Sequence, residues 1–152
     1  MIDGVPTVFR LDEATLAGMI PAIGSLIEPT GTAISPADVK FMVIESESGR
    51  LRLERDLDRW TISVDEEAAE EIKPATVQAL LDLLSETRST DLQVQAFPAS
   101  LEVATIVLHG FDGRPLDAIR IAREPDEGRW ALENGDGVLR LFPASTKIPL
   151  LR

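Results

Sequence analysis

The sequence contains no cysteine and no tyrosine, and only one of its 152 residues is a histidine. Without cysteine the chain can form neither disulfides nor thiolate metal sites, and it lacks a thiol nucleophile. A single imidazole leaves little material for a histidine-rich zinc site or for a Ser-His-Asp triad. Because aromatic residues make up 5% of the chain, carbohydrate or base stacking is poorly supplied.

The chain also lacks a long apolar run and a basic stripe. No segment approaches the ~20 apolar residues that cross a bilayer, and no signal peptide or membrane anchor is recognisable. The net charge of −11 opposes binding to phosphate backbones. The arginines alternate with acidic residues, as in residues 50–56, which is typical of a solvated strand face. We therefore predict neither a nucleic-acid partner nor direct membrane insertion.

One segment of the sequence is written twice with variations. Residues 39–60 and residues 103–130 each begin with an apolar run, break at a Gly-Arg pair and end at an Arg-Trp pair. The two copies align without a gap from their first valines to Gly49 and Gly113. Repetition of a supersecondary unit at a fixed period predicts a repeated architecture.

A helix is expected before each copy of the repeat. Asp12 can cap the first helix, whose apolar stripe comprises Leu16, Met19, Ile20, Ile23 and Ile27. Pro21 lies inside this pattern and predicts a kink or two short helices. Pro74 suits the first turn of the second helix, whose stripe comprises Val77, Leu80, Leu81 and Leu84.

Alternating and β-rich segments predict the strands. They cover residues 39–45, the surroundings of Leu51 and Leu53, and residues 60–64, 102–109, 116–122, 129–133 and 138–142. Gly113 and the glycines of residues 134–137 favour hairpin turns, because these turns require positive φ angles. The acidic residues 65–71 are expected to form a solvated loop or the approach to the second helix, and residues 85–91 a polar link.

These patterns predict an α+β fold. We expect residues 1–152 to form a single compact domain of two pseudo-repeats, approximately 1–72 and 73–152, each with one helix packed on an antiparallel β-meander of three to four strands. A fainter match joins Asp3-Gly4-Val5 to Asp136-Gly137-Val138. If this match reflects the same repeat unit, the chain would be an excerpt of a longer repeat array; the alternative is a full protein of two units.

Several segments together resemble a known bacterial family. They are residues 8–12, 34–39 and 49–55 with Trp60, and in the second half residues 77–84, 119–121 and 137–138. The sequence is similar to the domain of unknown function 4340, an uncharacterised repeat domain found beside gliding-motility-type ABC transporter components. The resemblance implies an extracytoplasmic protein, periplasmic or membrane-anchored in its full-length form, with protein partners that include transporter components. It supplies no catalytic residues.

Two motifs carry side chains that could form a chemical site. His109 ends a predicted strand, and Asp112 is near enough in sequence to orient it, but no nucleophile accompanies them. We therefore predict that His109 is a polar residue at a hairpin edge. Residues 133–137 carry oxygen ligands, yet they lack the alternate spacing and the distant glutamate of a calcium-binding EF-hand loop. A hairpin turn is the favoured interpretation.

Two further features have a structural and a functional interpretation. The acidic side chains of residues 65–71 (Asp65, Glu66, Glu67, Glu70 and Glu71) could offer a diffuse cation-binding face, but a charge run is usually a solvated surface. Trp60 and Trp130 occupy matching positions in the repeat. Their large area favours a role in the core over ligand stacking.

The sequence therefore identifies no catalytic, metal-binding or cofactor-binding residues. We predict a non-catalytic protein-interaction or scaffold module of the bacterial cell envelope, accessory to an ABC-type transporter. The alternative is a small-ligand binding module at the repeat junction, which would require a deep pocket where polar groups converge. A third hypothesis, an acid/base hydrolase, would require two facing carboxylates with opposed pKa shifts.

Overall fold

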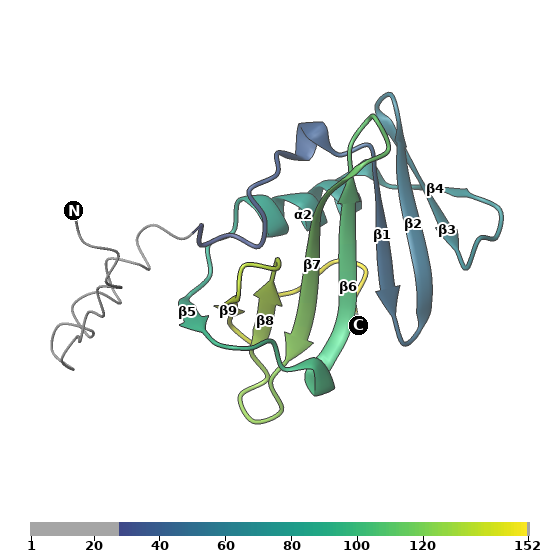
Figure 1. The fold of residues 1–152 in the computed structure, drawn as a ribbon. Coiled ribbons are helices and arrows are strands. Elements are labelled where there is room, and N and C mark those ends of the chain that lie inside the picture. Colours follow the sequence, from purple (N-terminus) through teal and green to yellow (C-terminus); the bar gives the residue numbers. More distant parts are fainter. Residues whose placement is uncertain (1–27, 152) are drawn as a thin grey trace, which may run out of the picture.

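The computed structural model describes residues 28–151, which form one antiparallel sheet with a helix across one of its faces (Figure 1). The sheet has nine strands in the order β4-β3-β2-β1-β6-β7-β8-β9-β5. The strands are β1 (Phe41–Ser46), β2 (Gly49–Asp56), β3 (Arg59–Val64), β4 (Glu70–Ile72), β5 (Asp91–Val94), β6 (Glu102–His109), β7 (Pro115–Arg123), β8 (Trp130–Glu133) and β9 (Val138–Phe142). Two short 3-10 helices, η1 (Pro36–Asp38) and η2 (Ala99–Leu101), precede β1 and β6.

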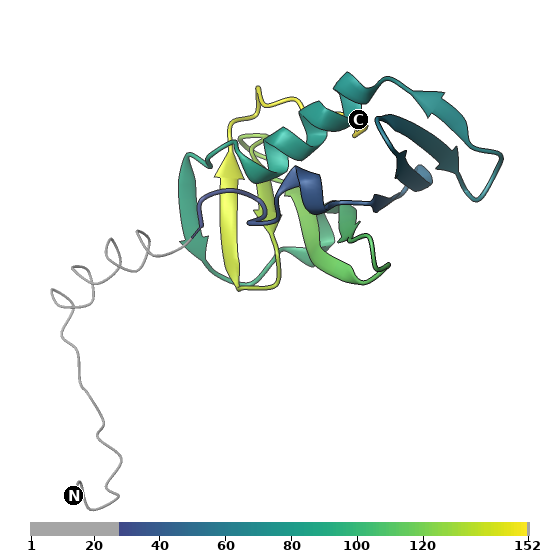
Figure 2. The same ribbon diagram turned by 90° about the horizontal axis from the view of Figure 1, so that it is seen from above.

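The α-helix is α2 (Pro74–Ser85), and it begins at a proline as the sequence predicts. Proline suits this position because the first turn of a helix has no partner for its N–H groups. The helix follows β4 at one edge of the sheet and leads to β5 at the other edge. The chain therefore crosses the sheet along one face, as Figure 2 shows from above. No helix within the described residues is long and apolar enough to span a membrane.

The main hydrophobic core lies between α2 and the sheet. The helix contributes its four predicted apolar residues, each at most 2% exposed. The sheet contributes residues from both halves: Met42, Ile44, Leu53, Trp60, Ala104, Ile106, Leu108, Ile119, Ile121, Trp130, Leu132 and Phe142. Each fully buried leucine side chain stabilises the fold by about 1.5–3 kcal/mol, so α2 holds the two halves of the sheet to a common core.

The opposite face of the sheet is covered only in part. Phe97 and Leu101 pack there against a small cluster formed by Ala122, Ala131, Leu139 and Leu141. These two residues lie on the connection between β5 and β6. The connection therefore covers the strands β7 to β9.

The predicted fold class is wrong, because the described residues do not form two helix-plus-meander repeats. The strands β1–β4 and β6–β9 are successive neighbours, and β1 pairs with β6 so that all of them belong to one sheet. This pairing satisfies backbone groups that two separate meanders would leave unpaired at their edges. The predicted first helix, with Asp12, Leu16 and Pro21, and the match at Asp3 lie outside the described residues.

Two polar segments contain strands that the sequence did not predict. Residues 70–72 form β4, in which Ile72 lies opposite Trp60 of β3. Asp91 begins β5, which pairs with β9 at the other edge of the sheet. Both strands are short and lie at an edge, where polar and charged side chains discourage further strand addition. The sequence patterns therefore gave loops where the structure has edge strands.

Candidate functional site

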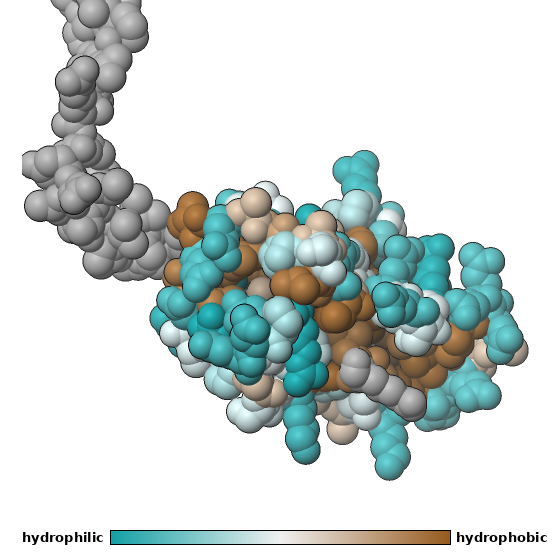
Figure 3. Space-filling view, turned by 90° about the horizontal axis from the view of Figure 1, so that it is seen from below, coloured by the Kyte–Doolittle hydropathy of each residue, from teal (hydrophilic) through white to brown (hydrophobic). Residues whose placement is uncertain are grey.

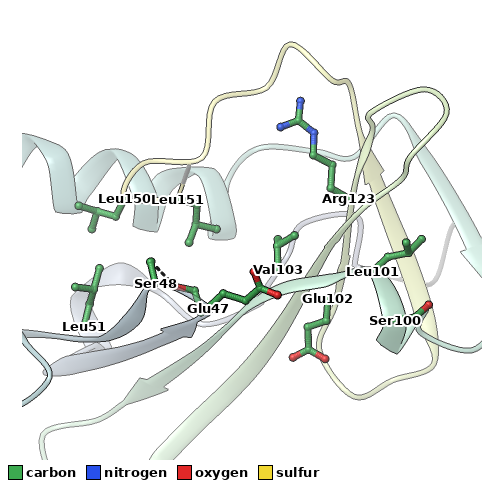
Figure 4. Close-up of a pocket in the computed structure, with 11 residues that line it drawn as sticks. Glu47, Ser48, Leu51, Ser100, Leu101, Glu102, Val103, Arg123, Leu150 and Leu151 are labelled. Atoms are coloured by element: carbon green, nitrogen blue, oxygen red, sulfur yellow. Dashed lines mark hydrogen bonds between the residues drawn. The ribbon is translucent and has the colours of Figure 1, made fainter.

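An open groove of about 880 Å³ lies at one end of the pair formed by β1 and β6 (Figure 4). We call it the junction groove, because β1 and β6 join the two meanders. Four parts of the chain line it: the β1–β2 hairpin (Ser46, Glu47, Ser48, Leu51), η2 with the start of β6 (Ser100, Leu101, Glu102, Val103), the end of β7 (Arg123) and the C-terminal segment (Leu150, Leu151). Figure 3 shows hydrophobic residues gathered at this end of the molecule between hydrophilic ones.

The apolar walls of the groove continue the two hydrophobic clusters. Leu51, Val103, Leu150 and Leu151 are half-buried and pack against the main core. Leu101 packs against the smaller cluster on the opposite face of the sheet. The groove therefore exposes the margin of the core at the strand ends, where an apolar partner could extend it.

A β-bulge shapes the floor of the groove. The register of β6 against β7 shifts between Glu102 and Ala104, and such a shift re-aims the neighbouring side chains. Val103 consequently packs toward the main core, while Glu102 forms an ion pair with Arg120, at 2.8 Å. Figure 4 shows the Glu102 carboxylate pointing away from the groove.

The charged side chains that line the groove do not all point into it. In Figure 4 the Glu47 carboxylate reaches across the groove, whereas the Arg123 guanidinium points away from it. That guanidinium lies 4.7 Å from the centroid of the Trp130 ring, a distance typical of a cation–π interaction. Among the described lining residues, Glu47 is thus the charged group that faces the groove.

The Glu102 carboxyl is held in its ionised form. Its hydrogen bonds from the Thr105 hydroxyl, at 2.6 Å, and from the Arg120 guanidinium lower its pKa. The same guanidinium lies 4.0 Å from the centroid of Phe97. A carboxylate engaged in this way is suited to holding β6, β7 and the covering connection together, and poorly suited to donating a proton.

The structure places His109 at the end of β6, as predicted. Its imidazole stacks on Phe41, and its Nδ1 lies 3.3 Å from the carbonyl oxygen of Gly113. Asp112 does not orient it, because the Asp112 carboxylate instead accepts a hydrogen bond from the backbone N–H of Arg114, at 3.0 Å. The two residues considered together in the sequence are therefore not brought together as a catalytic pair.

Residues 133–137 form a turn that uses its own acidic groups, and the predicted hairpin is confirmed. The buried Glu133 carboxylate accepts hydrogen bonds from the backbone N–H groups of Gly135 and Gly137. Asp136 forms an ion pair with Arg140, at 2.6 Å, and Arg140 is 1% exposed. Partial burial raises the pKa of Asp136, but hydrogen bonds from Arg140 and from the backbone of Val138 outweigh this effect and lower it.

The acidic segment of residues 65–71 is exposed; residues 65–69 turn the chain between β3 and β4, and Glu70 and Glu71 begin β4. The Asp65 carboxylate accepts a hydrogen bond from the backbone N–H of Arg50, at 2.8 Å. Its oxygens would also lie within 3.0 Å of a Cβ placed on Gly49, whose φ angle is +129°. Within residues 28–151, no group of three histidine or acidic side chains is arranged to hold a metal ion.

Both tryptophans belong to the main core, as predicted. Trp60 is 4% and Trp130 6% exposed. An arginine covers each ring, because Arg55 lies 4.9 Å from the centroid of Trp60 and Arg123 lies 4.7 Å from that of Trp130. The Trp130 indole also donates a hydrogen bond to the carbonyl of Thr146, at 3.0 Å. The rings therefore close the core and are not presented to a ligand.

Leu51, Glu102 and Val103 of the junction groove were predicted only as strand residues, and no lining residue was predicted to belong to a site. The available signal was weak: the apolar pair Leu150-Leu151 follows a proline and belongs to neither copy of the repeat. Comparison of the chain with protein-family models, with curated proteins and with solved structures finds no match in any of the three. A function must therefore be argued from the groove itself.

Proposed function

We propose that the protein is a non-catalytic interaction module that binds an apolar segment of a partner protein in the junction groove. The observation that carries this proposal is the set of half-buried aliphatic side chains that border the groove. An open hydrophobic margin of this kind is typical of a binding surface. The volume of about 880 Å³ falls within the ~300–1,000 Å³ of ligand sites, near its upper end.

The two carboxyls with lowered pKa support a structural role over a catalytic one. Glu102 and Asp136 each form an ion pair with a single arginine. They lie on different elements, at the start of β6 and in the turn before β9. A hydrolase would instead be expected to bring two carboxyls together and to shift their pKa values in opposite directions.

The alternative is a small-ligand binding module that uses the same groove. Its position at the junction of β1 and β6 favours this function, because a small-ligand module of this kind requires a pocket at the repeat junction. A site for a small ligand, however, usually directs several polar groups at its occupant. Glu102 and Arg123 point away from the groove, and we therefore favour an apolar protein segment.

Selection from a library of random linear peptides tests the proposal. We expect the immobilised chain to select peptides rich in leucine, isoleucine or valine. Substitutions Val103→Thr and Leu151→Gln should each weaken binding of a selected peptide about tenfold in fluorescence anisotropy, an order of magnitude that corresponds to the loss of one buried aliphatic contact. Denaturant unfolding would establish that both variants remain folded.

Phe111 provides a matched control for this experiment. It is apolar and 64% exposed, and it lies in the turn between β6 and β7, outside the groove. Phe111→Ser should leave peptide binding unchanged. Equal losses in Phe111→Ser and Leu151→Gln would contradict a specific groove. Saturable binding of a small amphiphile such as decanoate, without any selected peptide, would favour the alternative.

The location and the partner remain predictions from the sequence resemblance. The resemblance predicts that the full-length protein faces away from the cytoplasm. It also predicts that the partner is a component of an ABC-type transporter. Fractionation of cells that produce the full-length protein tests the location, and reciprocal co-purification with a transporter component, abolished by Leu151→Gln, tests the partner.

A further inference from the structure

We propose that the junction groove recognises a segment in which aliphatic side chains are followed by a lysine or an arginine, and that the cation pairs with Glu47. This inference rests on the proposed function, because it specifies the partner of the same site. The aliphatic walls would receive the apolar side chains, and the Glu47 carboxylate would receive the positive charge.

Glu47 differs from the neighbouring carboxylates in its partners. Glu45 lies 3.7 Å from Arg50 and Glu102 lies 2.8 Å from Arg120. Glu47 is exposed and forms no ion pair within the part of the chain that the structure describes. Since its carboxylate extends across the groove in Figure 4, it is placed to meet the charge of an occupant.

The hairpin below Glu47 is held by its own hydrogen bonds. The hydroxyls of Ser46 and Ser48 lie 2.8 Å apart on either side of it. The preceding residue, Ser46, pairs with β2, where it lies opposite Gly49. Glu47 therefore projects from an ordered turn, and less conformational entropy is lost when a partner binds it.

Within residues 28–151, the positive charge that lines the groove is directed elsewhere. Arg123 lines the groove, but its guanidinium lies against the Trp130 ring and points outward. The chain as a whole carries a net charge of −11. Like charges repel an acidic segment and opposite charges steer a basic one toward its site, so both the local and the overall charge favour a basic partner.

The size of the groove fits a segment of several residues. A volume of about 880 Å³ exceeds what one side chain would fill. Aliphatic residues from both faces of the sheet border it, with Leu101 on one side and Leu151 on the other. A segment that crosses the strand ends could therefore place one aliphatic side chain against each wall and its basic residue beside Glu47.

A pair of fluorescein-labelled peptides tests the charge preference. The probes are Ser-Leu-Val-Leu-Lys-Ser and Ser-Leu-Val-Leu-Glu-Ser, titrated with the full chain at low salt and followed by anisotropy. We expect the lysine peptide to bind about fivefold more tightly, as befits an exposed ion pair. The preference should shrink between 0.01 M and 0.15 M salt, because the Debye length falls from about 30 Å to about 8 Å.

Variants of Glu47 assign this preference to one residue. Glu47→Gln should make the two Kd values equal, and Glu47→Lys should reverse their order. Glu86→Gln removes another exposed carboxylate, at the end of α2 and outside the groove, and it should leave the preference unchanged. Because Glu47 is exposed in a turn, these variants are expected to fold, and their unfolding curves would check this.

The outcomes separate the inference from the function on which it rests. If both peptides bind equally tightly, or if Glu47→Gln keeps the preference, the inference is overturned while the interaction module stands. If neither peptide binds the full chain and library selection yields none, both are overturned. Binding of dodecylamine in place of the peptides would overturn the peptide partner and favour a small cationic amphiphile.

Discussion

The imidazole of His109 stacks on the ring of Phe41, with 4.2 Å between the ring centroids and 10° between the planes. The Arg52 guanidinium lies 4.1 Å from the centroid of the same phenyl ring. Because β2 and β6 flank β1, these two groups approach Phe41 from neighbouring strands on opposite sides. The stack therefore links three strands on the face of the sheet opposite α2.

We expect substitutions of Phe41 and His109 to have non-additive effects on stability, because the two rings interact. Phe41→Leu and His109→Gln should be less destabilising together than their separate effects imply, by about 0.5–1.5 kcal/mol. Denaturant unfolding of the wild type, both single variants and the double variant measures this difference. Phe111→Leu combined with His109→Gln is the control, and its effects should be additive within about 0.5 kcal/mol. Additivity in the first pair would show that the stack contributes nothing.

Removing Asp136 should lower the free energy of unfolding more than removing its partner Arg140. Asp136→Ala leaves a guanidinium that is 1% exposed without its carboxylate, and we expect a loss of about 3 kcal/mol in the free energy of unfolding. Arg140→Met fills the same space with an apolar chain and leaves a carboxylate that is 38% exposed and can be hydrated. The loss in the free energy of unfolding should be clearly smaller for Arg140→Met than for Asp136→Ala. Equal losses in urea titrations would contradict this account.

The stability of the protein should fall in acid. Glu102 and Asp136 have pKa values below their usual ones. At pH values between the folded and the unfolded pKa, the folded state therefore binds fewer protons than the unfolded state. Their contribution is present above the unfolded pKa values, ~4, and is lost as pH falls through the folded values. Unfolding free energies between pH 7 and pH 2.5 should fall less in Glu102→Gln than in the wild type. Glu86→Gln, the control, should follow the wild type.

Helix α2 should make both halves of the sheet unfold together. Leu80 is completely buried between the helix and the sheet, and Leu80→Ala should cost about 2–5 kcal/mol. The unfolding transition should remain single, whether followed by circular dichroism or by tryptophan fluorescence. Gln78→Ala, on the exposed side of the helix, should change stability by less than about 0.5 kcal/mol. Two separate transitions in Leu80→Ala would contradict a common core.

Local patterns predicted the elements that depend on local physics. Pro74 and four apolar residues at helical spacing identified α2, and the β-rich run of residues 102–109 identified β6. The edge strand β4 escaped prediction because its first two residues are glutamates. It is held by pairing with β3, an interaction between segments that no periodicity within β4 reveals.

The arrangement of the repeat could not be inferred from its period. Two similar segments can form separate sheets or one sheet, and the choice here depends on pairs such as Val43 with Val107. The junction groove could not be predicted from the sequence either, because it also depends on long-range strand pairing. Glu47, Val103 and Leu151 come from three distant segments, and only the completed sheet brings them to one end. The sequence supported the absence of a recognisable catalytic motif, but it did not indicate a binding surface.

The pairing of β1 with β6 also bears on the rate of folding. Paired residues in these two strands are about sixty positions apart in the chain, whereas β1 pairs with β2 through a short turn. Long-range pairing of this kind slows folding, because loop entropy is lost before the contacts form. We therefore expect the meanders to form early and the joining of β1 to β6, with α2 across both, to limit the rate. Val107→Ala should then slow refolding.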